Sequence, residues 1–165
     1  MEPDEVCTLS GQSTVAKTLA TVQSVRLVPD QPPARPEAVA AVEEADAIVL
    51  GPGSWFTSVI PHLLVPDLAA AIHRTQATRI LVLNIASAAE TDGFTASRHI
   101  ELLAEHAPQL RLDKVIVDAK FSDRHLEAYA AALGGELVLA DVRARDGSTT
   151  HDINRLASVF SEVIG

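Results

Sequence analysis

The chain has few of the features that would assign a protein to a class at once. A single cysteine, Cys7, excludes an internal disulfide framework and fits a reducing compartment. No His, Lys or Arg lies close to it in sequence to activate a thiol, so we expect an incidental or structural role. Aromatic residues make up only 4% of the chain, whereas Ala, Val and Leu are abundant, as in folds where helices cover a sheet.

Positive charge is also scarce. Lys and Arg number 13 against 22 Asp and Glu, which gives a net charge of −9. No long basic run occurs, so DNA and RNA are excluded as partners. No apolar stretch approaches the ~20 residues that cross a bilayer, and Glu2, Asp4 and Glu5 stand where a signal peptide would be basic. We therefore expect a cytoplasmic protein with no membrane partner.

Strands alternate with helices along most of the chain. The apolar runs predict strands at 22–28, 47–50, 79–84, 114–118 and 137–139. Helices are predicted at 36–45, 57–64, 66–74, 95–106 and 123–133, the last capped by Asp123, and a terminal helix is N-capped by Asp152. The 79–84 run is apolar on both faces, which is typical of the centre of a parallel sheet. The order predicts a doubly wound α/β fold with a mostly parallel sheet.

The start of the chain does not fit a complete fold of this kind. Residues 1–20 carry little periodicity, and 6–9 is a weak strand at best. In open α/β sheets the first βα turn normally holds the main phosphate loop, and none precedes this sheet. We expect the whole chain, 1–165, to be the C-terminal part of a single nucleotide-binding domain with an irregular start.

The most informative stretch runs from Ala45 to Ser58. A short buried strand ends at Leu50, where Gly51-Pro52-Gly53 stops it. The glycines allow a sharp bend and a close approach by another molecule. Ser54 is placed to cap the helix that follows, and a strand, glycine turn and helix N-terminus together can seat a phosphate. On spacing alone, an ordinary βα turn that binds nothing is an equal alternative.

Two blocks of this chain resemble the signatures of a known family. They are GPGSWFTSVIPHLLV, which begins at Gly51, and ETDGFTAS, which begins at Glu90. They are similar to the GPGSLYTSIIPNLLV and ETDGYTASDH forms of the bacterial gluconeogenesis-factor family. That family lies in the superfamily of 2-phospho-L-lactate transferase, the CofD-like proteins. Its members are longer and open with a glycine-rich GGGTG-type loop, so the resemblance implies the C-terminal half of a CofD-like, Rossmann-like domain with an incomplete sheet.

The resemblance also implies a function. It points to a regulator that binds a sugar nucleotide, UDP-N-acetylglucosamine, and links gluconeogenic carbon metabolism to cell shape and peptidoglycan synthesis, with no catalytic residue and no required cofactor. The alternative is a phospholactate-type transferase that acts on a deazaflavin precursor with Mg²⁺. A third hypothesis is an interaction module that binds neither. A homo-oligomer stays open.

Ligand-binding roles follow from the resemblance for two groups of residues. The diphosphate motif and its second polar pair match Gly51, Gly53, Ser54, Thr57 and Ser58. The end of the next strand and the second block match Asn84, Glu90, Thr91, Asp92 and Gly93. Carboxylates at 90 and 92 could hold a divalent ion or ribose hydroxyls. The alternative is a simple turn at 92–93 followed by an N-cap at 95.

This chain departs from the family forms at several positions. Trp55-Phe56 replaces Leu-Tyr, Phe94 replaces a Tyr, and His62, Arg98 and Thr150 replace an Asn, an Asp and an Arg. Loss of the Tyr hydroxyl at position 94 removes a hydrogen bond to a ligand, and Thr150 removes a phosphate partner. We expect any role at these two positions to be changed.

Other chemistry finds little support in the sequence. Neither block contains a Lys or Arg, so cationic help must come from Arg79, Arg143, Arg145 or the remainder of a longer domain. His99 and His106 lie seven residues apart without a third ligand, so no metal site is predicted, and we expect most histidines at the surface or at edges. Ser54 lacks the following glycine of a hydrolase elbow and the chain lacks a Walker lysine. The Asp118-Ala-Lys120 segment suggests a strand-end ion pair more than a catalytic pair.

Overall fold

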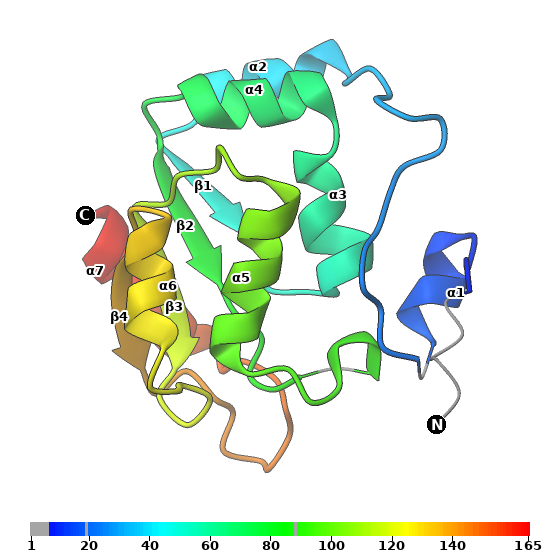
Figure 1. Ribbon diagram of the computed structural model, residues 1–165. Helices are drawn as coiled ribbons and strands as arrows, with labels where there is room; N and C mark the ends of the chain where they lie inside the picture. The colour runs from blue at the N-terminus through cyan, green and yellow to red at the C-terminus, as the bar shows by residue number, and fades with distance from the viewer. Residues whose placement is uncertain (1–6, 19, 88) are drawn as a thin grey trace.

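A four-stranded parallel sheet forms the centre of the molecule (Figure 1). The computed structural model describes residues 7–18, 20–87 and 89–165. Its strands follow chain order, β1 (Ala47–Leu50), β2 (Thr78–Val82), β3 (Lys114–Asp118) and β4 (Glu136–Ala140). All three neighbouring pairs are parallel, with Leu50 opposite Leu81 and Val82 opposite Ile116. The predicted α/β class and parallel sheet are therefore confirmed.

Helices cover both faces of this sheet. They are α1 (Gln12–Ala16), α2 (Pro36–Glu43), α3 (Ile60–Leu63), α4 (Pro66–Arg74), α5 (Ala96–His106), α6 (Leu126–Ala132) and α7 (Ile153–Ile164). Two short turns complete the set, a π-helical one, η1 (Trp55–Val59), and a 3-10 one, η2 (Ala89–Thr91). Figure 1 shows α5 and α6 on one face and α7 on the other.

The core is divided by the sheet into two clusters. Leu81 and Val115 lie in the larger cluster with side chains of η1, α3, α5 and α6. Ile80, Val82 and Ile116 lie in the smaller one, against α7. All five side chains are fully buried. Successive residues of a strand point to opposite faces, so central strands covered on both sides are apolar throughout, as the 79–84 run predicted.

Most predicted elements lie where expected. The strands at 47–50 and 114–118 and the helix at 66–74 are confirmed to the residue. The strand predicted at 79–84 is shifted to 78–82, and that predicted at 137–139 extends over 136–140. The carboxylate of Asp152 accepts hydrogen bonds from the main-chain N–H groups of Asn154 and Arg155, so it caps α7 as predicted.

The strand predicted at 22–28 is wrong. This segment is extended coil, because no strand among the described residues pairs with it. Val22 and Val25 are partly buried against the larger cluster, while Val28 is 88% exposed. The apolar residues of this segment therefore pack against the core as coil and do not belong to a hydrogen-bonded strand. Residue 6 of the weak strand at 6–9 lies outside the described residues, and 7–9 are coil.

Two predicted helix starts need correction. The helix predicted at 57–64 begins at Trp55 as η1 and continues as α3, so the chain turns into a helix directly after the glycine turn. Asp123 does not begin α6, which starts at Leu126. Its carboxylate accepts hydrogen bonds from the main-chain N–H and the hydroxyl of Ser97, and from the N–H of His125. Asp123 thus joins the first turn of α5 to the start of α6.

No single helix in the described part of the chain is long and apolar enough to cross a membrane. The segments Trp55–Leu63 and Pro66–Arg74, which are bent by 72° relative to each other, together reach that length and apolar composition, but this rests on length and composition alone.

Gly51 gives a test of the connection between β1 and β2. It has φ +74°, and a Cβ there would lie 2.5 Å from the carbonyl oxygen of Val82. We expect Gly51→Ala to lower the free energy of unfolding by about 3 kcal/mol or more, because strain and a backbone clash add. Gly147→Ala is the matched control: its φ is +82° with open space around the Cβ, and about 1 kcal/mol is expected. Equal losses in urea unfolding would contradict the close approach.

Candidate functional site

The candidate site lies where the four parallel strands end. The segments that follow β1, β2, β3 and β4 begin at residues 51, 83, 119 and 141. Because the strands are parallel, all four segments start at the same edge of the sheet, which is where open α/β sheets bind their ligands. Both blocks identified in the sequence belong to this edge, the glycine turn after β1 and the 90–93 segment after β2.

Asn84 fastens the glycine turn to the end of β2. Its side-chain oxygen accepts a hydrogen bond from the Gly53 N–H at 2.9 Å, and its Nδ2 donates to the Gly53 carbonyl at 2.9 Å. The Asn84 carboxamide therefore hydrogen-bonds both the N–H and the carbonyl of Gly53, as a neighbouring main chain does in a β-sheet. Asn84 therefore orders the turn through its side chain, a role that differs from direct contact with a ligand.

Glu90 is the second group that orders the turn. It is 2% exposed, and its Oε1 accepts hydrogen bonds from the Ser54 hydroxyl at 2.7 Å and the Phe56 N–H at 3.3 Å. Ser54 occupies the N-cap position of η1, but its side chain makes no capping hydrogen bond. The expected Ser54 cap is wrong because the hydroxyl donates to Glu90 and also contacts the Thr57 hydroxyl. A glutamate from a distant segment does the work of the cap.

These contacts bear on the predicted phosphate seat. The N–H groups of Gly53 and Phe56 are already hydrogen-bonded within the protein. Those of Ser54, Trp55 and Thr57 have no hydrogen-bond partner among residues 7–18, 20–87 and 89–165. Trp55 and Thr57 are buried, and Ser54 is half-buried. The turn therefore has three N–H groups without a partner among the described residues, two of them on buried residues, and its role in ligand binding stays a prediction.

The remaining predicted residues are divided between surface and interior. Ser58, Asp92 and Gly93 are exposed, whereas Thr91 is buried. The two carboxylates of the second block therefore differ in environment: Glu90 is buried and hydrogen-bonded within the protein, whereas Asp92 is exposed. Thr95 caps α5, since its side chain accepts a hydrogen bond from the Arg98 N–H. No group of three His, Cys, Asp or Glu side chains in the described ranges is arranged to hold a metal ion.

His99 is buried, whereas most histidines were expected at the surface or at edges. It is fully buried, and its ring meets those of Trp55 at 5.1 Å, Phe94 at 5.6 Å and Phe121 at 5.8 Å, all edge-on. Burial lowers the pKa of His99, against smaller opposing effects of the Thr95 carbonyl and the Glu90 charge. A neutral ring that donates from Nδ1 to that carbonyl fits this setting.

The spacing of two histidines carried the signal for this environment. His99 and His106 stand seven residues apart on α5, and their rings meet Trp55 and Phe56, respectively. They share the helix face that packs on η1, as the spacing suggested. The residues where this chain departs from the family, Trp55-Phe56, therefore form the wall between the turn and α5.

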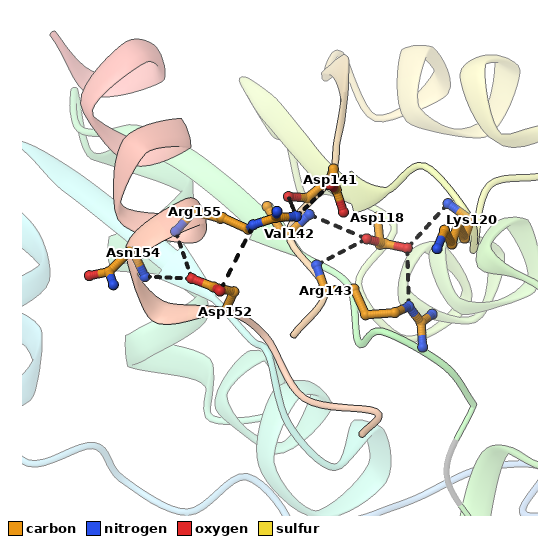
Figure 2. A network of polar contacts seen from close by, with 8 residues as sticks. All are labelled: Asp118, Lys120, Asp141, Val142, Arg143, Asp152, Asn154 and Arg155. Carbon is orange, nitrogen blue, oxygen red and sulfur yellow. Dashed lines mark hydrogen bonds and ion pairs between the residues drawn. The ribbon is translucent and has the colours of Figure 1, made fainter. Parts of the chain in front are cut away.

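Asp118, at the end of β3, organises the other half of the edge (Figure 2). It is 1% exposed. Its Oδ1 accepts a hydrogen bond from the Lys120 N–H at 3.1 Å and lies 3.5 Å from the Arg143 Nε. Its Oδ2 accepts from the main-chain N–H groups of Val142 and Arg143. The expected ion pair with the Lys120 side chain is wrong: the charge partner is Arg143, which comes from the segment after β4.

The three arginines proposed as sources of charge lie in different places. Arg79 stands near the start of β2, at the opposite edge, where it pairs with Asp113 at 3.1 Å. It is too far along the strand to serve the carboxyl edge. Arg143 and Arg145 belong to the segment after β4 and do lie at this edge. Arg143 also donates to the Ile85 carbonyl at 2.5 Å, which joins that segment to the one after β2.

Two shallow cavities lie away from this edge. They have volumes of about 340 and 420 Å³ and share a lining of Arg74, Thr75, Gln76 and Ala77. These residues precede β2, so the cavities open at the amino end of the sheet. Their arginines are already paired, Arg74 with Glu43 and Arg79 with Asp113.

The fold and this edge together define a Rossmann-like α/β protein with a glycine turn at the carboxyl end of its sheet. A family model described as 2-phospho-L-lactate transferase CofD matches residues 2–158, and the chain belongs to this family. Several of its curated relatives are named as gluconeogenesis factors. The relative from Mycobacterium tuberculosis strain H37Rv is 48% identical over 94% of this chain and 47% of its own length. That from Halalkalibacterium halodurans is 34% identical over 85% and 44%.

Solved structures agree with this assignment. A crystal structure of a UPF0052-family protein from Bacillus halodurans superposes with a TM-score of 0.76 and 28% identity. It covers 94% of this chain and 54% of the other. The chain therefore spans about half the length of the relatives it matches.

Glu90 gives a test of how the turn is ordered. We expect Glu90→Ala to lower the free energy of unfolding by about 1–3 kcal/mol, because the Ser54 hydroxyl and the Phe56 N–H lose their acceptor. The fluorescence of Trp55, the only tryptophan, should change as the turn loosens. Glu90→Gln keeps an acceptor oxygen and should restore most of both signals. Identical behaviour of the two variants would show that Glu90 does not act as this acceptor.

Burial of His99 predicts a pH dependence of stability. Because its pKa in the folded protein lies below the ordinary value of 6.5, the unfolded chain binds the proton more readily. Stability is therefore present above that pH and decreases as the pH falls through it. Urea unfolding at about pH 7.5 and about 5.5 should show this decrease, and His99→Gln should reduce it. A variant with the same decrease as the unsubstituted chain would contradict the assignment.

Proposed function

We propose that this chain binds a sugar nucleotide, UDP-N-acetylglucosamine, at the carboxyl edge of its sheet. Bound there, it would act in the cytoplasm as a regulator that links gluconeogenic carbon metabolism to cell shape and peptidoglycan synthesis. No covalent chemistry is involved. Membership of the family, with relatives named as gluconeogenesis factors, supports the link to gluconeogenesis. The nucleotide itself rests on the resemblance of the two sequence blocks.

One observation carries the location of the ligand. The glycine turn and the 84–93 segment, which are separated by some thirty residues of chain, meet at one edge through Asn84 and Glu90. The side chains of the turn are therefore held before any ligand arrives, which lowers the ordering cost of binding. Exposed groups at the rim, Ser58 and Asp92, remain for polar contacts with a sugar or ribose.

The transferase alternative has no such support. Its reaction uses a divalent ion, and no group of three His, Cys, Asp or Glu side chains among the described residues is arranged to hold one. It is kept as an outcome of the assay: incubation with a guanosine-activated donor and a deazaflavin precursor should give no transfer product. Product formation would replace the regulatory hypothesis with the enzymatic one.

Calorimetry with UDP-N-acetylglucosamine tests the proposal. We expect binding to the chain, accompanied by a change in Trp55 fluorescence because this residue begins η1. Ser58→Asp should weaken binding about tenfold or more, since it adds a carboxylate at the exposed rim of the edge that receives a negatively charged ligand. Ser158→Asp on α7 adds the same charge on the other face of the sheet and should leave affinity unchanged. Absence of heat at millimolar ligand, or equal effects of the two variants, would contradict it.

A further inference from the structure

The carboxyl edge carries a group of cations that neither sequence block contains. We propose that Lys120, Arg143 and Arg145 form an anion subsite, built by the segments after β3 and β4, that holds the diphosphate of the ligand. This inference rests on the proposed function and names the charge partner that its ligand needs. In this proposal the glycine turn determines the shape of the site, and the three cations bind the negative charge of the ligand.

The first step is the fixed position of Arg143. Its guanidinium lies between the buried Asp118 and the Ile85 carbonyl, so it is held at the point where the segments after β2, β3 and β4 meet. Its side chain is 23% exposed, which leaves one edge open to solvent. An arginine held on two sides and open on a third can bind an oxyanion with little loss of side-chain entropy.

The second step is the position of Lys120. Asp118 Oδ1 accepts its main-chain N–H and also faces the Arg143 Nε, so one oxygen brings the two residues together. Figure 2 shows Lys120 and the Arg143 guanidinium on one side of Asp118, with the Arg155 ion pairs on the other. The Lys120 side chain is exposed and makes no ion pair with any of the described residues. Its ammonium is therefore available to a ligand.

The third step is the hairpin that carries Arg145. Arg143 and His151 form an antiparallel bridge, and the Ala144 N–H donates to the Thr150 carbonyl at 3.0 Å. The Asp146 carboxylate accepts from the Ser148 N–H and thereby closes the tip. The loop is ordered by these bonds, yet Arg145 is exposed and has no carboxylate partner within the described ranges.

The charge at the turn explains why the subsite lies here. Glu90 already occupies the hydroxyl of Ser54 and the N–H of Phe56 with its own negative charge. A diphosphate placed against those donors would meet that carboxylate. Across the same edge, Asp118 is paired with Arg143, and the exposed side chains of Lys120 and Arg145 form no ion pair with the described residues, with the exposed Asp146 next to Arg145 in the chain. The anion is attracted to the β3–β4 side, while the remainder of the ligand faces the turn.

Charge-removing variants test the subsite. Lys120→Gln and Arg145→Gln should each weaken binding of inorganic pyrophosphate about fivefold, and the double variant more. Arg111→Gln removes the same charge from an exposed residue near the start of β3, at the opposite edge, and should have no effect. Arg143 is left in place because Asp118 would otherwise be buried without its partner. Calorimetry at two salt concentrations gives the affinities, and urea unfolding checks that each variant is folded.

The two probes separate the subsite from the proposed function. The subsite is supported, and the sugar nucleotide is overturned, if the unsubstituted chain binds pyrophosphate but not UDP-N-acetylglucosamine and the double variant loses pyrophosphate binding. Binding of UDP-N-acetylglucosamine that is equal in the double variant and the unsubstituted chain overturns the subsite and leaves the function. An effect of Arg111→Gln equal to that of Lys120→Gln also overturns it. Failure of the unsubstituted chain to bind either probe overturns both.

Discussion

The close contact between the glycine turn and the end of β2 is the constraint on which the rest of the edge depends. Gly51 lies so near the Val82 carbonyl that no other residue fits there without a shift of the backbone. Asn84, two residues beyond Val82, then returns with its carboxamide to hold both main-chain groups of Gly53. A parallel sheet cannot join neighbouring strands by a tight turn, so the ends of β1 and β2 come from distant parts of the chain. These contacts fix their separation.

Glu90 extends this constraint into the core. Its carboxylate reaches the start of η1 from the segment after β2, and no cation among the described residues forms an ion pair with it. A buried carboxylate is costly unless donors surround it. The Ser54 hydroxyl and the Phe56 N–H, at the start of η1, donate to Oε1, whereas Oε2 is buried without a hydrogen-bond partner among the described residues. Because the Glu90 carboxylate is already there, the turn is a less favourable place for the anionic part of a ligand. The residues that shape the site therefore differ from those that bind its charge.

Regular elements of this chain could be predicted from the sequence, whereas the contacts among their ends could not. The strands at 47–50 and 114–118 are short apolar runs between clear breakers, and this local pattern predicted both, although the edge strand β1 is only partly buried, with Val49 42% exposed. The segment 22–28 has a similar pattern, but no strand among the described residues pairs with it. Whether a pairing partner is present depends on the tertiary structure and not on the local sequence. Ser54 shows the same limit at the site. A serine before a helix predicts a cap, yet Glu90, 36 residues away, takes the hydroxyl for itself.

An acidic chain that binds an acidic ligand needs local charge that its composition conceals. A formal charge of −9 is poorly suited to nucleic acid, because a long polyanion contacts a wide surface. A diphosphate contacts only a few groups, so a small set of cations suffices if other charges are paired elsewhere. The ion pairs of this chain do that. Arg79 and Arg74 are paired at the amino edge, and Arg155 pairs with Asp141 beside α7. Lys120 and Arg145 stay unpaired at the carboxyl edge, where the parallel strands direct the connecting segments. The direction of the strands therefore places these two cations beside the carboxyl ends of β3 and β4.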